Sequence, residues 1–329
     1  MSSDSTAVSA STSGSQSGSI EFTLRRMYQR AGEDTLPAHL RDAHGIEVTK
    51  MTKLAVGVYR VDHHDKSEPL VVRMFSRERS IAAAQGDLAV LRYLAAIRFP
   101  AERPYGDTPS SIHEGQPVLV TGFIKRVPPA KRPPYPIVRL GAIIGRLHGL
   151  PIPPSADRPA GSLHHFAEGT LADELRAASG WLDAAQSAVP SGSSAHFDTL
   201  RAQILMADGG QGLPQGFVHP DPVPKNVVFT ENGPVLVDWT GAGRGPRLAS
   251  LTLILQSGWA AVPFMKGYLK RNVLTTDERQ RLAGLLYSRR LINLAFEVCR
   301  EPERLATRTV KLKQLRTACD AQAEELLSL

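Results

Sequence analysis

Three oxygen-bearing side chains in residues 216–247, GFVHPDPVPKNVVFTENGPVLVDWTGAGRGPR, have the types and the spacing that phosphoryl transfer requires. Asp221 and Asn226 lie on one short loop, and Asp238 follows after two extended runs. Transfer of a phosphoryl group needs an oriented acceptor hydroxyl and a hard cation on the phosphate oxygens. Mg²⁺ prefers one or two carboxylates together with phosphate oxygens and water. Asp221 is therefore the candidate for orienting and deprotonating the hydroxyl, and Asn226 and Asp238 are candidates for holding the ion.

A predicted hairpin brings these side chains together. The extended runs 227–230 and 235–237 flank the dipeptide Asn232-Gly233. This dipeptide between β-branched runs predicts a type I′ turn, in which both central residues have positive φ. The hairpin would return Asp238 to the neighbourhood of Asn226. Asp, Asn and Pro also occupy turns for purely local reasons, but the complete spacing, with an acid at its end, favours the functional interpretation.

The spacing His-x-Asp-x4-Asn followed by Asp-Trp resembles the catalytic core of the aminoglycoside phosphotransferase and choline kinase family, which has the protein-kinase fold. The family's loop reads roughly HGDLHPGN and here it reads HPDPVPKN, so the chemical positions match while Pro222, Val223 and Lys225 depart from the pattern. The resemblance implies an α+β fold of two lobes, ATP or GTP as phosphoryl donor, and Mg²⁺. It also implies that His219 holds the loop by packing and hydrogen bonding, and we expect Trp239 in the core.

The order of predicted elements is that of a kinase-like fold. A small antiparallel-sheet lobe is predicted from strands at 47–54, 58–62, 70–75, 110–114 and 117–124, with a helix at 80–99 after the third strand and two helical pieces within 21–44. A larger lobe is predicted from helices at 137–150, 171–188, 195–207, 259–271, 276–299 and 301–328. We therefore expect a disordered tail at 1–20, a nucleotide-binding lobe at 21–124 and a catalytic, acceptor-binding lobe at 125–329.

The resemblance also implies charged residues of the nucleotide site in the small lobe. In the third strand, LVVRMF, Arg73 takes the place of the basic residue that binds the α- and β-phosphates. Arginine keeps the charge and can bind two oxygens at once, although an ordinary exposed strand arginine is the alternative. Asp87, in the following helix, takes the place of the acid that orients this base. Glu78 is its competitor, and a plain solvent-facing role for Asp87 is equally open.

Gly57 and the predicted hinge at 121–123 are the other candidates for nucleotide binding. The loop after the first strand, KLAVGVYRV, contains the single glycine Gly57. Gly57 could let backbone N–H groups approach the phosphates, or it could form a plain hairpin turn. Backbone groups from Thr121 to Phe123 are expected to pair with the adenine edge, an expectation that rests on the fold alone.

Two further motifs occur in the predicted larger lobe. IVRLGAIIGRLHGL, residues 137–150, resembles the family's LG..L..LH helix, in which we expect His148 to pack rather than to bind a ligand. After Asp238, GRGPRLASLTLIL resembles a family pattern, but Ser250 stands where an Asp is frequent. In the family that Asp braces the catalytic loop. The resemblance thus predicts a rearranged support in this chain, or a degenerate enzyme.

The sequence does not identify the acceptor. Acidic side chains that could face it are Asp173, Glu174, Glu297 and Glu301, each of which is alternatively an ordinary surface charge. A polycationic aminoglycoside would need a dense acidic pocket, and no such cluster stands in the sequence, which argues against that class without excluding it.

Composition describes an ordinary globular chain of 329 residues with 42% hydrophobic and 22% charged residues and a net charge of +7. Its Lys and Arg residues occur mostly at helical spacing among acids, so we expect no nucleic-acid partner. Cys299 and Cys319 lack metal-like spacing, which favours a reducing cytoplasm. The Ser-rich residues 1–20 do not form a secretory signal, and the longest apolar run, 251–264, is too short for a membrane span.

Two functional classes follow. The first is a Mg²⁺-dependent kinase that uses ATP or GTP to phosphorylate a hydroxyl of a small molecule: an antibiotic, an amino alcohol, an amino acid or a sugar. The second is a nucleotide-binding pseudokinase that acts as a sensor or interaction partner. The residues Asp221, Asn226 and Asp238 favour the enzyme, whereas the single Gly57 and Ser250 favour the pseudokinase. A protein kinase is disfavoured because Asp-Trp replaces Asp-Phe-Gly. The sequence sets no oligomeric state.

Overall fold

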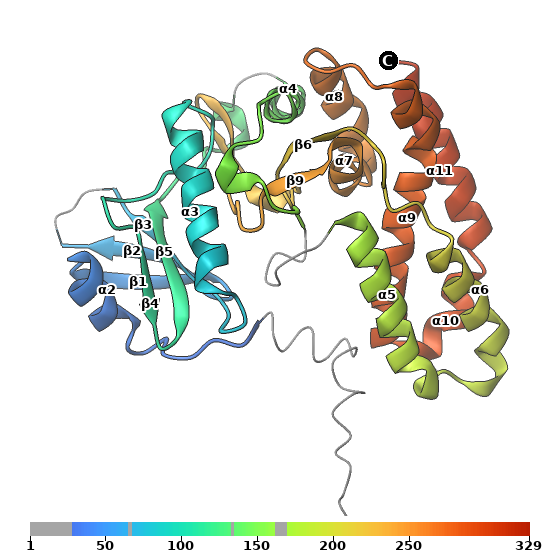
Figure 1. The fold of residues 1–329 in the computed structure, drawn as a ribbon, viewed down its shortest axis with the longest axis horizontal. Coiled ribbons are helices and arrows are strands. Elements are labelled where there is room, and N and C mark those ends of the chain that lie inside the picture. Colours follow the sequence, from blue (N-terminus) through green and yellow to red (C-terminus); the bar gives the residue numbers. More distant parts are fainter. Residues whose placement is uncertain (1–27, 65–67, 133–134, 162–169) are drawn as a thin grey trace, which may run out of the picture.

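The computed structural model describes residues 28–64, 68–132, 135–161 and 170–329. A five-stranded antiparallel sheet with two helices forms one lobe, and a larger group of helices forms the other (Figure 1). The sheet has the order β1-β2-β3-β5-β4, from β1 (Val48–Ala55), β2 (Val58–His63), β3 (Leu70–Met74), β5 (Gln116–Gly122) and β4 (Ser110–His113). Helices α2 (Leu36–His44) and α3 (Ile81–Ala96) pack beside it. The predicted α+β class is confirmed, and the tail predicted at 1–20 lies outside the described residues.

The larger lobe is built around two short strand pairs. Its helices are α4 (Pro136–His148), α5 (Leu171–Ala185), α6 (Ser194–Leu205), α7 (Arg247–Leu255), α8 (Gly258–Leu269), α9 (Thr276–Arg300), α10 (Leu305–Thr309) and α11 (Leu312–Leu327). Strand β6 (Gln215–Val218) pairs with β9 (Gly243–Pro246), and β7 (Val227–Thr230) pairs with β8 (Gly233–Leu236). No helix among the described residues is long and apolar enough to cross a membrane.

The prediction of one helix over 301–328 is wrong. Helix α9 ends at Arg300, and the chain then forms a 3₁₀ turn at Pro302–Arg304 before the separate helices α10 and α11. Glu301 has φ −138° and ψ 67°, outside the helical region. The ring of a proline disfavours the α conformation at the preceding residue, so Pro302 explains why the chain leaves helix α9 here.

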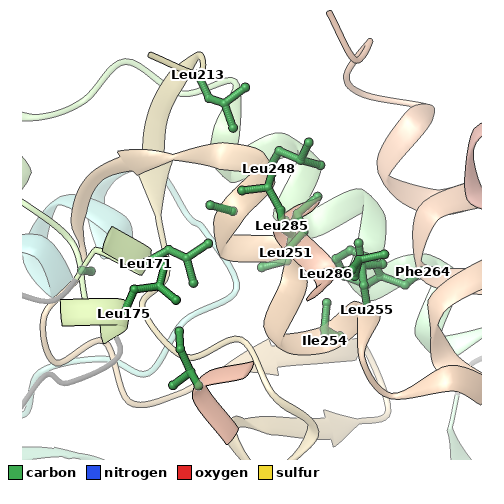
Figure 2. Close-up of a cluster of buried hydrophobic side chains, with 14 of the residues drawn as sticks. Leu171, Leu175, Leu213, Leu248, Leu251, Ile254, Leu255, Phe264, Leu285 and Leu286 are labelled. Carbon is green, nitrogen blue, oxygen red and sulfur yellow. The ribbon is translucent and has the colours of Figure 1, made fainter. Parts of the chain in front are cut away.

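The larger lobe's core fixes the strand pair next to residues 219–226, which we call the catalytic loop after the role that the sequence predicts for it. Figure 2 shows a part of it, in which leucines of α5, α7 and α9 and Phe264 of α8 belong to one cluster of buried side chains. Leu248, Leu251 and Leu255 on α7 are fully buried. Helix α7 begins directly after β9, and β9 pairs with β6, which leads into the catalytic loop. Burial of α7 therefore anchors the strand pair that carries the loop.

The predicted hairpin forms, but its turn differs from the prediction. Thr230 pairs with Gly233, so Glu231 and Asn232 are the central residues, and neither has positive φ. The positive φ of 131° falls on Gly233, which follows the turn. The Thr230 hydroxyl accepts the Asn232 N–H at 3.2 Å and thereby completes the turn locally. The expected return of the chain is confirmed, because the Val237 N–H donates to the Asn226 carbonyl oxygen at 3.0 Å.

Glycines on α4 and α8 allow these two helices to cross with their backbones in contact. A Cβ atom at Gly141 would lie 2.0 Å from the Phe264 carbonyl oxygen, and one at Gly267 would lie 1.9 Å from the Val138 carbonyl oxygen. Any side chain at these positions would force the helices apart. This crossing accounts for the glycine in the LG..L..LH motif.

Gly141→Ala should lower the free energy of unfolding by about 1–3 kcal/mol, because the added methyl group overpacks the α4–α8 crossing. Equilibrium denaturation in urea measures the change. Gly180→Ala in α5 is the matched control, since a Cβ atom there meets nothing within 4 Å. Alanine is the better helix former, so the control should keep or gain stability. Equal losses in both variants would contradict the role assigned to the crossing.

Candidate active site

His219 holds the catalytic loop in place, as expected. Its Nδ1 accepts the backbone N–H of Asp221 at 3.1 Å, and its Nε2 donates to the Val237 carbonyl oxygen at 3.1 Å. The ring also lies edge-on to Trp239, with 4.7 Å between ring centroids, and Trp239 is buried in the core. Both ring nitrogens are thus committed to the backbone, so His219 fixes the loop and is not available to substrate.

The structure brings Asp221 and Asn226 into direct contact. The Asn226 side-chain N–H₂ group donates to the Asp221 carbonyl oxygen at 2.9 Å and to its carboxylate Oδ2 at 3.0 Å. Lys225 also reaches Oδ2, with its Nζ at 3.2 Å. Lys225 stands where the family's loop differs, and the sequence interpretation gave it no role. The i,i+4 spacing of an acid and a base across the Pro224–Asn226 3₁₀ turn was the available signal.

Asp238 lies beside Asn226 and faces the small lobe. Its backbone has φ 66°, in the left-handed region that disfavours side chains other than glycine, asparagine and aspartate. Its backbone N–H donates to Oε1 of Glu102 at 2.8 Å, and its carboxylate Oδ1 lies 3.1 Å from Nη1 of Arg73. The predicted phosphate and metal residues therefore converge. Such strained conformations occur preferentially at functional sites.

Glu102 is a site residue that sequence reasoning missed. Its backbone N–H donates to the Leu236 carbonyl oxygen at 3.2 Å, and its Oε2 accepts the Thr121 hydroxyl at 3.3 Å. Burial raises the pKa of Glu102, and nearby Arg73 offsets only part of that rise. Burial alone would lower the pKa of Arg73, but Asp238 and Glu102 outweigh it and raise that pKa. No pattern in the segment FPAERPYG marks this glutamate, because its partners lie far away in the chain.

The expected direct pairing of Asp87 with Arg73 is not what the structure shows. Asp87 is buried, and its Oδ2 accepts Nε of Arg79 at 3.1 Å. Its Oδ1 bonds with Arg158 and accepts the backbone N–H of Gly241 at 3.0 Å. Asp87 is still close enough to contribute to the raised pKa of Arg73. Asp87 therefore braces the segment after Asp238. It does not pair with Arg73, whose ion pair is formed with Asp238.

Gly57 forms the tight β1–β2 turn, the second of its two expected roles. With φ 66°, its carbonyl oxygen accepts the Met74 N–H at 2.7 Å. A Cβ atom here would lie 2.3 Å from the Met74 carbonyl oxygen, so only glycine fits. The turn is thus packed against the end of β3. Residues beside it, Leu54, Ala55 and Val58, line the cleft described below.

Two backbone N–H groups of the predicted hinge, residues 121–123, already donate hydrogen bonds within the small lobe. The N–H of Gly122 donates to the Arg103 carbonyl oxygen and that of Phe123 to the Pro69 carbonyl oxygen, both at 2.9 Å. The Thr121 hydroxyl is bonded to Glu102. The N–H groups of Gly122 and Phe123 are thus used inside the small lobe, although both residues line the cleft described below. The expected pairing of this hinge with an adenine edge stays a prediction.

One cleft between the lobes contains the converging residues. Its volume is about 430 Å³ and it opens to solvent, which suits a nucleotide-sized ligand. Val71 of the sheet and Val228 and Val237 of the hairpin line its apolar part. Its polar end carries the charged and amide side chains of Arg73, Glu102, Lys225, Asn226 and Asp238. The cleft thus offers an apolar compartment joined to a charged one.

A family model described as the phosphotransferase enzyme family matches residues 56–285. The chain belongs to this phosphotransferase family. The match includes the catalytic loop, Asp238 and both walls of the cleft. No curated protein matches the sequence.

Solved structures place this phosphotransferase among proteins with the protein-kinase-like fold. An amicoumacin kinase in complex with AMP-PNP, Ca²⁺ and Ami has a TM-score of 0.59 and 15% identity, over 89% of this chain and 96% of that one. A microcompartment-associated aminopropanol kinase has a TM-score of 0.57 and 16% identity, over 90% and 98%. A choline kinase from Streptococcus pneumoniae has a TM-score of 0.55 and 13% identity, over 88% and 100%. At these identities the likeness shows the fold alone.

Ser250 makes its contacts within α7 and with His148 of α4, and the rearranged support of the catalytic loop stays a prediction. The Ser250 hydroxyl donates to the Arg247 carbonyl oxygen at 2.8 Å and lies 3.4 Å from Nε2 of His148. His148 also contacts the Tyr268 hydroxyl through Nδ1 at 3.1 Å, which confirms the expected packing role. Ser250 therefore joins the α4–α8 region, and the segment after the hairpin is braced by Glu102 and Asp87 of the small lobe.

Stability should fall in acid because His148 must stay neutral. Burial lowers its pKa to about 3, against an ordinary value of 6.5. Between these values the unfolded chain binds a proton that the folded protein excludes. The contribution is complete above pH 6.5 and is lost by about 1.4 kcal/mol per pH unit as the pH falls toward 3. His148→Gln should flatten this acid limb in urea denaturation at several pH values, whereas His64→Gln, at an exposed position, should leave it unchanged. An unchanged limb in His148→Gln would refute the assignment.

Proposed function

We propose that this phosphotransferase transfers the γ-phosphoryl group of ATP or GTP to a hydroxyl of a small molecule, with Mg²⁺ as cofactor. The observation that carries the proposal is the convergence of Asp221, Asn226, Asp238 and Arg73 at the polar end of one cleft. Phosphoryl transfer depends on positioning and charge stabilisation, which such a constellation supplies.

Asp221 is proposed to orient the acceptor hydroxyl and to take its proton. Asn226 and Lys225 both bond to Oδ2. The described residues provide no hydrogen bond to Oδ1, which leaves that atom for the hydroxyl. The Lys225 Nζ, 3.2 Å from the carboxylate, keeps a positive charge where the transferring phosphoryl group would pass.

Asn226 and Asp238 fit the oxygen-ligand chemistry of Mg²⁺. The Asn226 N–H₂ group is bound to Asp221, so its carbonyl Oδ1 points to the other side. Asp238 adds a carboxylate beside it, and nucleotide phosphates would complete the ligand set. The ion would neutralise the charge that develops on the phosphoryl oxygens. An amicoumacin kinase with AMP-PNP and Ca²⁺ and a spectinomycin phosphotransferase with ADP, both similar in fold, support nucleotide and divalent-ion binding.

Arg73 is proposed to neutralise the α- and β-phosphates, with Glu102 as its positioning carboxylate. For the base, the residues that follow the expected hinge are further candidates. Ile124 and Arg126 line the cleft beyond Phe123, and we propose their backbone groups as partners of the adenine or guanine edge. The choice between ATP and GTP and the cytoplasmic location stay predictions.

The pseudokinase is the second candidate. The ion pair between Arg73 and Asp238 favours it, because it occupies both groups that a metal–nucleotide complex would need. The loop that contains Gly57 also has only this one glycine, which favours the same candidate. Metal-dependent nucleotide binding and turnover distinguish the two candidates.

Mg-nucleotide should stabilise the chain, and Asp238→Ala should abolish the Mg²⁺-dependent part of that stabilisation. At a nucleotide concentration 100 times the dissociation constant the gain is about 2.7 kcal/mol. Thermal shift with ATP and GTP, with and without Mg²⁺, measures it. Asp107→Ala, at an exposed aspartate outside the cleft, should behave like the parent chain. A full shift retained in Asp238→Ala would reject the metal assignment.

Asp221→Asn should reduce turnover by about 10²–10⁴-fold while nucleotide binding stays near that of the parent, since the amide cannot accept the hydroxyl's proton. Nucleotide consumption in the presence of acceptor and thermal shift with Mg-nucleotide report the two properties separately. Asp198→Asn on the exposed face of α6 is the control. Near-parental turnover in Asp221→Asn would remove this residue from the mechanism.

A further inference from the structure

Arg158, which precedes α5 in the chain, connects helix α3 of the small lobe to the segment that follows Asp238. Its side chain is 25% exposed, and its Nη2 binds the Asp87 carboxylate on α3. Its Nη1 donates to the Ala83 carbonyl oxygen of the same helix at 3.0 Å. Its Nε donates to the Ala242 carbonyl oxygen at 3.1 Å. All three nitrogens of the guanidinium are therefore bonded, to one carboxylate and two backbone carbonyl groups.

Residues 238–242, which we call the metal-ligand loop, are held at both ends. The N–H of the first residue donates to Glu102 at 2.8 Å. Near the other end, the Gly241 N–H donates at 3.0 Å to Oδ1 of Asp87, the same oxygen that binds Arg158. A residue with a strained backbone persists only where surrounding contacts hold it. Arg158 fixes the far end of this loop directly through a carbonyl oxygen and indirectly through a carboxylate.

Two glycines give Arg158 the room that its contacts require. A Cβ atom at Gly86, inside α3, would lie 2.7 Å from Nη1 of Arg158. A Cβ atom at Gly243 would lie 2.3 Å from the Arg158 carbonyl oxygen, which accepts the Arg244 N–H at 2.7 Å. Glycine is a poor helix former, and here the guanidinium lies in the space that a side chain at position 86 would take.

We propose that Arg158 is a positioning residue for Asp238 and that the Mg²⁺ affinity of the site depends on it. The role of Asp238 as a Mg²⁺ ligand is taken from the proposed function, on which this inference rests. Residues that orient a metal ligand without touching the ion change metal affinity by about 10–100-fold when they are replaced. Arg158 acts in this way through the metal-ligand loop, and it makes the position of the ligand depend on α3.

Charge balance alone is the competing role for Arg158. Asp87 is buried and needs positive partners, and Arg79 is already one of them. A lysine at position 158 would supply the same charge. Its single ammonium group lacks the planar fork of arginine, so it could not reproduce the bonds to the carboxylate and to both carbonyl oxygens. Arg158→Lys therefore separates positioning from charge balance, and it keeps the fold supported by the retained charge.

Arg158→Lys should raise the Mg²⁺ concentration that gives half of the metal-dependent stabilisation by about tenfold. Thermal shift across a Mg²⁺ titration at a fixed concentration of ATP or GTP measures it. The shift that nucleotide gives in EDTA should equal that of the parent chain, because Asp238 then holds no ion. Arg244→Lys is the matched control, since its exposed pair with Asp157 lies beside the same segment. It should titrate like the parent.

Gly86→Ala moves the guanidinium of Arg158 without changing any charge. The added methyl group meets the end of a flexible side chain, and alanine favours the helix, so stability in urea should be kept or raised. We nevertheless expect the same weakening of about tenfold in the Mg²⁺ titration. Gly180→Ala in α5, where a Cβ atom meets nothing within 4 Å, should leave the titration unchanged.

Hydrogen exchange in the chain without ligands tests the positioning itself. Amides of the metal-ligand loop should exchange faster in Arg158→Lys and Gly86→Ala than in the parent chain, because the far end of the loop loses its bonds to the side chains of Arg158 and Asp87. The controls Arg244→Lys and Gly180→Ala should exchange like the parent in these peptides.

The outcomes separate this inference from the proposed function. A parent chain without any Mg²⁺-dependent stabilisation rejects the proposed metal site and this inference with it. A parent chain that responds to Mg²⁺, beside parent-like titrations of Arg158→Lys and Gly86→Ala, overturns this inference alone, and so does parent-like exchange of the loop amides. Weaker Mg²⁺ dependence together with faster loop exchange, in both variants and in neither control, supports it.

Discussion

Two buried carboxylates of the small lobe hold the segment that carries Asp238, and the geometry of the site depends on them. Glu102 accepts the backbone N–H of Asp238, and Asp87 accepts that of Gly241. Both bonds cross from one lobe to the other. An aspartate with positive φ needs such external restraint, because its conformation is intrinsically unfavourable. The position of the Asp238 carboxylate is therefore set by the contact between the lobes as much as by the hairpin that precedes it.

Neither carboxylate could be buried without compensation. An ionised carboxylate loses a large hydration free energy on burial, so it needs charged partners and hydrogen bonds. Asp87 obtains Arg79 and Arg158, and Glu102 obtains the nearby Arg73 together with the Thr121 hydroxyl. Arg158 comes from the larger lobe and also donates to the Ala242 carbonyl oxygen. Arg158 of the larger lobe thus supplies a positive charge that compensates Asp87 of the small lobe. Burial of this carboxylate therefore depends on contact between the lobes.

The sequence predicted what short-range patterns determine and missed what distant partners determine. The loop spacing located Asp221 and Asn226, and the hairpin returned Asp238 to them, because only about twenty residues separate these positions. Arg73 was predicted from its place in the third strand, LVVRMF, which resembles the family's strand. The prediction that Asp87 pairs with Arg73 was wrong. Asp87 is buried, and the arginine that reaches it there is Arg79. Glu102 carried no signal, since its role exists only once its segment lies beside β8 and β5. The turn at 231–232 was misplaced by one residue because the Thr230 hydroxyl stabilises it without positive φ.

Under the proposed roles, the Arg73–Asp238 ion pair couples the ion to the nucleotide. When a metal–nucleotide complex binds, each side chain would replace its present partner. Arg73 would pair with phosphate oxygens, and Asp238 would bind Mg²⁺. A nucleotide without the ion would satisfy Arg73 but leave the Asp238 carboxylate, 17% exposed, without its cation. The ion without a nucleotide would take Asp238 from Arg73 and leave Glu102 as its nearest remaining counter-charge. Because breaking a partly buried pair from one side alone is unfavourable, binding of the two together is favoured over binding of either. Under the proposed roles, the pair that favours the pseudokinase would therefore also favour a metal–nucleotide complex over either ligand alone.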